Sequence, residues 1–106
     1  GDGRQSRDFV YVKNVVSANL LGAEGAAEKV AGQVFNIGCG GSIDLVRLAA
    51  ELNRLTAQEL RPNHVAERAG DIKFSEADIS AAREGLGYEP EVSFGDGLGK
   101  TLDFYR

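Results

Sequence analysis

Residues 33–55 read QVFNIGCGGSIDLVRLAAELNRL and set the architecture expected of this chain. The first five of them, 33–37, have the β-branched and aromatic content of a largely buried strand. A glycine-rich turn follows, and Ser42 can cap the next helix, where leucine and alanine recur at steps of three and four residues. Asp44 lies favourably near the positive end of that helix dipole. The stretch predicts a strand, a tight turn and an amphipathic helix.

The preceding residues predict another strand that leads into a helix. Residues 8–12 (DFVYV) are β-prone, and Asn14 offers a side-chain oxygen to the first amides of a helix. Apolar residues at steps of three and four then mark one helical face over residues 14–30, and Gly32 ends the helix.

The second half of the chain is more polar at first and then helical. A weak strand is expected near residues 64–67, followed by a short helix that Asp78 caps and Gly87 ends in the left-handed conformation. Ser93 resembles the start of a capping box, and helical spacing continues to the chain end. Three glycines in the first two turns of this last helix cost about 2–3 kcal/mol of propensity, so an irregular or tightly packed start is expected.

Together these patterns predict an α/β fold with a few short strands and about four helices, organised as a single domain over residues 1–106. A chain of 106 residues with 42% hydrophobic and 26% charged content can bury only a modest core. The chain begins with Gly-Asp-Gly and contains no methionine, which suggests that an upstream portion is missing.

Charge and cysteine content exclude some classes of function. The formal net charge is −4 and no run of lysine and arginine occurs, which argues against sequence-independent nucleic-acid binding. Cys39 is the only cysteine, so no intramolecular disulfide is possible. No secretory signal or apolar run long enough to span a bilayer is present, which predicts a cytoplasmic protein with no membrane partner.

A small phosphate ligand needs cations that converge in space, and four are candidates: Arg4, Arg7, Arg68 and Lys73. Arg7 follows a flexible glycine turn and leads into an expected strand. A guanidinium held there can bind phosphate oxygens through two parallel hydrogen bonds. A surface ion pair between Arg7 and Asp8 is an equally good interpretation from local sequence.

A second segment, ERAGD at residues 67–71, also places an arginine and a carboxylate around a glycine turn. Arg68 could hold a diphosphate while Asp71 accepts hydrogen bonds from ribose hydroxyls. Taken alone, such a segment is more often a solvated turn.

The glycine-rich turn at residues 38–42 is a third candidate, because it follows a strand and opens a helix. It lacks the lysine of a phosphate-binding loop, and Ile43 stands where a dinucleotide-binding turn would have its last glycine. A structural turn is therefore favoured over an anion site. His64 has no second histidine or cysteine at ligand spacing, so no metal site is expected, and Cys39 is interpreted as a small turn residue.

Five short motifs in order resemble one family: GDG…RDFVYV, VFNIGxG, RAGD, LGYEP and the terminal FYR. The chain resembles the C-terminal, substrate-binding part of NAD-dependent nucleotide-sugar epimerases and dehydratases, in the extended short-chain dehydrogenase/reductase family, and most of all its UDP-glucose 4-epimerase-like isomerases. The resemblance implies that Arg7 and Arg68 clamp the diphosphate of a UDP-type sugar, that Asp71 binds its ribose, and that Phe74 faces the sugar. It also implies that residues 33–37 belong to the parallel sheet of a Rossmann half.

The chemistry of that family requires a glycine-rich NAD fingerprint and a Tyr-x-x-x-Lys pair, and this chain has neither. The intact family uses NAD, but none is expected to bind this chain alone, which is catalytically incomplete and contributes no catalytic residue. Two hypotheses follow. The chain is the nucleotide-sugar-binding half of an enzyme and works with a missing Rossmann half, or it is a non-enzymatic fragment that self-associates as a homodimer or by exchanged elements.

Overall fold

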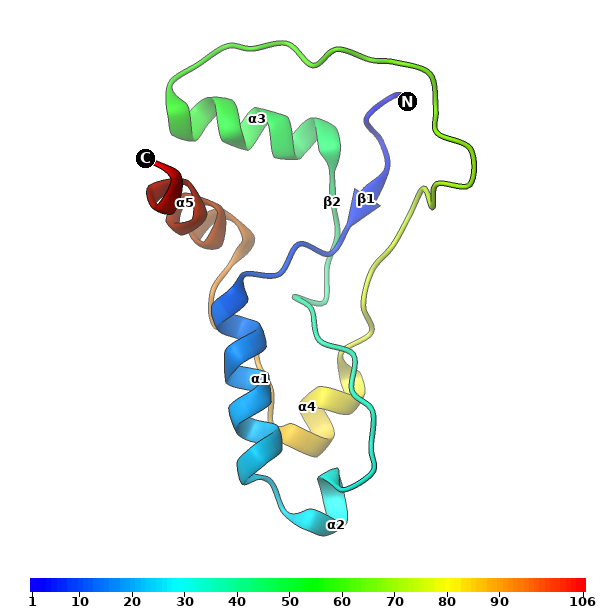
Figure 1. The fold of residues 1–106 in the computed structure, drawn as a ribbon, viewed down its shortest axis with the longest axis vertical. Helices are drawn as coiled ribbons and strands as arrows, with labels where there is room; N and C mark the ends of the chain where they lie inside the picture. The colour runs from blue at the N-terminus through cyan, green and yellow to red at the C-terminus, as the bar shows by residue number, and fades with distance from the viewer.

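The computed structural model describes residues 1–106 and contains five helices and two very short strands (Figure 1). The helices are α1 (Val12–Glu24), α2 (Ala27–Val30), α3 (Leu45–Thr56), α4 (Ser80–Leu86) and α5 (Phe94–Tyr105). The strands are β1 (Ser6–Arg7) and β2 (Ile43–Asp44). This content confirms the α/β prediction with a few short strands.

β1 pairs on both of its edges with segments that are distant in the sequence. It runs antiparallel to β2, with Ser6 opposite Asp44 and Arg7 opposite Ile43. On its other edge Ser6 forms a parallel bridge with Phe74, in which Ser6 N donates to Lys73 O at 2.8 Å and Ser75 N donates to Ser6 O at 3.1 Å. The N-terminal segment therefore lies between the start of α3 and the long loop that follows α3.

α3 is the amphipathic helix that the sequence predicts, but its cap is different. Asp44 caps it, because its Oδ1 accepts a hydrogen bond from Arg47 N at 2.7 Å, so the prediction that Ser42 caps this helix is wrong. The amides of Leu45 and Val46 donate to the carbonyls of Gln5 and Gly3, at 3.2 and 3.0 Å. The first turn of α3 is thus tied to the N-terminal segment.

The helix predicted over residues 14–30 begins two residues earlier and breaks at Gly25, whose ψ of 157° is extended, into α1 and α2. Asn14 does not cap it. Its side chain is buried within α1 and pairs with the backbone of Val92, accepting from Val92 N at 3.0 Å and donating to Val92 O at 2.9 Å. Asn14 instead fixes the segment that leads into α5.

The predictions for the two C-terminal helices are largely confirmed. Gly87 ends α4 with a φ of 67°, and Ser93 Oγ caps α5 by accepting from Asp96 N at 3.2 Å. The prediction that Asp78 caps α4 is wrong, because Ile79 holds the N-cap position; Asp78 lies one residue earlier, where its Oδ1 accepts from Ser80 N at 3.0 Å. Close packing explains one glycine of α5, because a Cβ on Gly97 would lie 2.8 Å from the Cβ of Tyr11.

The predicted strands at residues 8–12, 33–37 and 64–67 are wrong for this chain. Residues 8–11 and 33–37 contain no regular strand, and residues 34–37 make no backbone–backbone hydrogen bond. A strand requires a neighbour that pairs with its amides and carbonyls. These segments have strand-forming sequence but lack that neighbour within the 106 residues.

The core of the chain is small and lies where α1 and α4 meet. Seven of 106 residues are buried, and four of these are apolar: Ala18, Ile79, Ala82 and Tyr88. The radius of gyration is 16.4 Å, against about 13 Å for a compact chain of this length. Figure 1 shows why, since α3 and α5 lie at one end, α1, α2 and α4 at the other, with extended segments between them. None of the five helices combines the length and the hydrophobicity that a transmembrane helix needs.

Removal of the Tyr88 hydroxyl is expected to destabilise this core. Tyr88 is fully buried and its hydroxyl donates to Gly38 O at 2.7 Å. Tyr88→Phe leaves that carbonyl without its partner, which costs about 1–3 kcal/mol of unfolding free energy in urea denaturation.

Burial also raises the pKa of Tyr88. The folded state therefore favours the neutral phenol over the phenolate. The stability that Tyr88 contributes is fully present below pH about 10 and is lost as the pH rises through the folded-state pKa.

Tyr105→Phe is the matched control, because Tyr105 is exposed and its loss of a hydroxyl should change stability by less than about 0.5 kcal/mol. Equal stability of the two variants would show that the Tyr88 bond contributes nothing.

Candidate functional site

A cavity of about 290 Å³ opens between the N-terminal segment and the loop after α3. It is lined by Gly1, Asp2, Gln5, Val65, Ala66, Glu67, Arg68, Asp71, Ile72 and Lys73. The two walls are joined by hydrogen bonds of Gly1, whose nitrogen donates to Val65 O at 2.6 Å and whose carbonyl lies 2.9 Å from His64 Nδ1. Together with the bridge between Ser6 and Phe74, these contacts bring the two candidate phosphate-binding segments together.

Arg68 and Asp71 lie in one turn and both line the cavity. Asp71 N donates to Arg68 O at 3.2 Å, and Gly70 between them has a φ of +82°, a conformation that favours glycine. The glycine therefore closes the turn that presents the guanidinium and the carboxylate to the same space.

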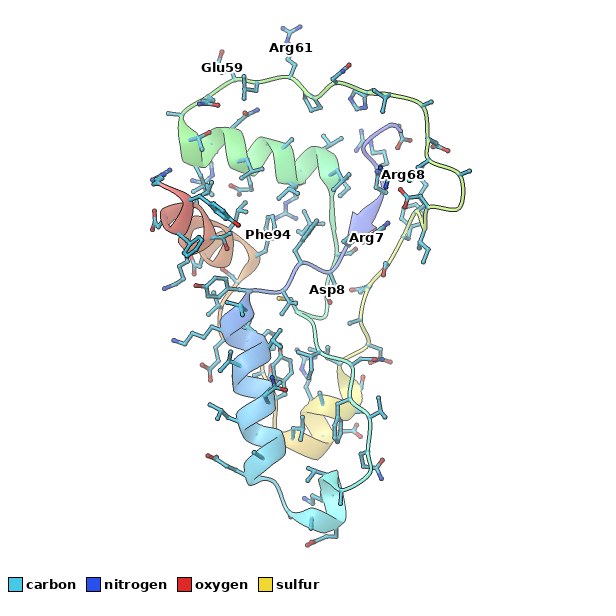
Figure 2. The ribbon with its side chains drawn as sticks, in the orientation of Figure 1. Arg7, Asp8, Glu59, Arg61, Arg68 and Phe94 are labelled. Carbon is cyan, nitrogen blue, oxygen red and sulfur yellow. The ribbon has the colours of Figure 1, made fainter.

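Arg7 lies in β1, beside the loop that carries Arg68, as the labelled side chains in Figure 2 show. Its Nη1 donates to Ser6 O at 2.7 Å and lies 3.5 Å from Lys73 O. Arg7 is half-buried and does not line the cavity. No ion pair joins it to Asp8, so the surface-pair alternative for Arg7 is wrong; that Arg7 and Arg68 share one ligand stays a prediction.

Phe74 takes part in the bridge to Ser6 through its backbone, and its side chain is 70% exposed. It is not among the residues that line the cavity. Its contact with a sugar stays a prediction.

The sequence did not single out Asp2, which belongs to the site. Its carboxylate accepts from Arg4 N at 2.8 Å and from Lys73 Nζ at 3.1 Å. These hydrogen bonds lower the pKa of Asp2, the backbone bond from Arg4 most of all. The sequence signal was a carboxylate between two glycines, which alone indicates only a turn. The Arg4 Nη1 lies 3.7 Å from Asp44 Oδ2, and Arg4 does not line the cavity.

The glycine-rich turn at residues 38–42 is already filled by a carboxylate of the chain. Asp8 accepts hydrogen bonds from Cys39 N at 2.8 Å and from Gly40 N at 3.0 Å. A Cβ on Gly38 would collide with the same carboxylate. Because two amides of the turn bind Asp8, the structural interpretation is favoured over an anion site.

Cys39 and His64 each contact a backbone carbonyl of the chain. Cys39 Sγ donates to Phe9 O at 3.4 Å, and burial together with the nearby Asp8 charge raises the pKa of the thiol. His64 contacts the backbone of Gly1, and no group of three or more potential ligands lies close enough to hold a metal ion.

Cys39 is expected to react slowly with alkylating reagents. Because the thiolate is the nucleophile and the pKa of this thiol is raised, its rate of reaction with iodoacetamide at pH 8 should be below that of glutathione. The pH of half-maximal rate should lie above that of glutathione. In urea the two rates should converge; a folded-state rate equal to that of glutathione would contradict the burial argument.

Comparison with known proteins gives consistent matches. Residues 1–38 match the model of the NAD dependent epimerase/dehydratase family. The UDP-glucose 4-epimerase of Mycolicibacterium smegmatis is 36% identical over 106 residues, which are 100% of this chain and 33% of that protein. The UDP-glucuronate 4-epimerase of Thermodesulfobacterium geofontis is 30% identical over 107 residues, with 100% and 32% covered.

Solved structures agree with these matches. The UDP-glucose 4-epimerase of Thermotoga maritima with UDP-glucose superimposes with a TM-score of 0.91 at 40% identity, over 100% of this chain and 33% of that one. The UDP-glucuronic acid 4-epimerase of Bacillus cereus, in complex with UDP-glucuronic acid and NAD, gives a TM-score of 0.89 at 31% identity, over 98% and 33%. The chain spans about a third of the length of the relatives that it matches.

Proposed function

We propose that this chain holds a UDP-type nucleotide sugar. In sequence and fold it matches the C-terminal part of NAD-dependent epimerases in the extended short-chain dehydrogenase/reductase family. The observation that carries the proposal is the convergence of Arg68 and Asp71 on one cavity beside β1. Relatives that were solved with UDP-glucose or UDP-glucuronic acid share this fold over almost the whole chain.

The roles of the side chains follow from their chemistry. Arg68 offers a planar set of donors to two diphosphate oxygens, and Asp71 can only accept, which suits ribose hydroxyls. Arg7 would add a second guanidinium from a position that β1 fixes. To do so it exchanges its bonds to the carbonyls of Ser6 and Lys73 for bonds to phosphate, a stronger acceptor because it is charged. Phe74 is proposed to face the sugar from the exposed side of the bridge.

The residues of this chain do not fit NAD. Its one glycine-rich turn between an extended segment and a helix binds Asp8 through two amides, and no Tyr-x-x-x-Lys pair is present. The proposed task of residues 1–106 is therefore substrate binding, and a Rossmann half on another segment or chain would supply the cofactor and the catalytic residues.

The open strand segments support this division. Residues 34–37 have no backbone partner, and Val34 within them is 89% exposed. The amides and carbonyls of a buried strand need hydrogen-bond partners. A group of exposed apolar side chains indicates a surface that another segment or chain covers. The comparisons favour this explanation over the self-associating fragment. Homo-oligomerisation and a cytoplasmic location stay predictions.

Calorimetric titration with UDP tests the proposal. Saturable binding is expected, and Arg68→Ala should weaken it about tenfold or more, because hydrogen bonds to charged groups contribute about 1.5–3 kcal/mol each. Arg83→Ala is the matched control, since Arg83 lies on α4 and pairs with Glu89 outside the cavity. Absence of binding at millimolar UDP, or equal losses in both variants, would refute the proposed site.

A further inference from the structure

The charges around the cavity do not suit an anionic ligand as they stand. Three carboxylate side chains line it, on Asp2, Glu67 and Asp71, against two cationic side chains, on Arg68 and Lys73. One of those cations is already engaged, because Lys73 Nζ lies 3.1 Å from Asp2 Oδ2. A diphosphate brings further negative charge, so its binding requires the cations of the site to be available to it.

Lys73 is held where it can serve the same ligand as Arg68. Its carbonyl accepts from Ser6 N at 2.8 Å, which fixes its backbone against β1. It follows the Arg68–Asp71 turn by two residues, and its side chain lines the same cavity. An ammonium has three donors, and the structure assigns only one of them a partner, on Asp2.

Asp2 is held opposite Lys73 by its own local turn. Its other carboxylate oxygen accepts from Arg4 N at 2.8 Å, and Gly3 has a φ of +77°. The hydrogen bonds from Arg4 and Lys73 lower the pKa of Asp2, so they stabilise its ionised form. The pair is open to solvent, with the Lys73 and Asp2 side chains 46% and 54% exposed. Exposed pairs of this kind change an equilibrium by at most about fivefold, so a phosphate group can displace the carboxylate.

We propose that Lys73 is a further phosphate-binding residue of this site and that Asp2 competes with the nucleotide for its ammonium. The inference rests on the proposed function and deepens it, because it adds a phosphate-binding residue and says that Asp2 pairs with Lys73 when no nucleotide is bound. Binding then exchanges one partner of Lys73 for another, and the affinity of the site is lower than its cations alone would give.

The test is a double-mutant cycle on UDP affinity. Asp2→Asn keeps an oxygen for Arg4 N but removes the charge, and it should tighten UDP binding about two- to fivefold. Lys73→Ala should weaken it about five- to tenfold, and Lys73→Arg should restore most of that loss. In the Asp2→Asn, Lys73→Ala double variant the gain from Asp2→Asn should disappear, which a purely structural role for either residue does not produce.

Uridine and a distant lysine provide the controls. Uridine lacks phosphate, so its affinity should be the same in all variants, and Lys100→Ala on α5 should leave UDP affinity unchanged. Circular dichroism confirms that each variant is folded. The proposed function stands if UDP binds and Arg68→Ala weakens its binding. The inference about Lys73 is then overturned if Asp2→Asn leaves UDP affinity unchanged or lowers it, or if Asp2→Asn raises UDP affinity by the same factor with and without Lys73. If the unsubstituted chain does not bind UDP, both fail.

Discussion

Backbone pairing on the two edges of β1 connects three segments that the sequence separates by tens of residues. One edge of β1 pairs with β2 at the entrance of α3, and the other edge bonds to Lys73 and Ser75 in the loop before α4. This two-residue strand holds the Arg68–Asp71 turn next to the N-terminal segment, together with the hydrogen bonds of Gly1 to Val65 and His64. The shape of the cavity and the placement of Arg68, Lys73 and Asp2 around it depend on these contacts.

The rest of the molecule explains why so small a ladder has this burden. The apolar core between α1 and α4 lies at the other end of the molecule from the cavity (Figure 1) and does not reach it. Hydrophobic burial is the main source of folding free energy, and here few side chains escape water. Polar contacts, such as the Asn14 side chain on Val92 and the Asp8 carboxylate on two amides, therefore connect the two ends.

Local patterns predicted what depends on neighbours in sequence. Helical spacing gave α3, α4 and α5, and the roles of Gly87 and Ser93 followed from ordinary capping rules. Residues 33–37 failed as a strand for a physical reason, because strand propensity is realised only when another strand supplies hydrogen bonds. Asn14 failed as a cap because its partner, Val92, lies 78 residues away. In the site, Arg68 and Asp71 could be named from a resemblance, whereas the pairing of Asp2 with Lys73 needs the folded chain.

The Asp8 carboxylate shows how a chain can convert a ligand-binding motif into internal scaffolding. A glycine-rich bend ahead of a helix exposes amides that attract any anion within reach. Here the anion is covalently part of the polypeptide, delivered from the segment next to Arg7. Glycine spacing by itself therefore cannot distinguish a nucleotide cradle from a self-satisfied bend. The decisive question for such motifs in other sequences is whether an acidic side chain elsewhere in the fold reaches the amides first.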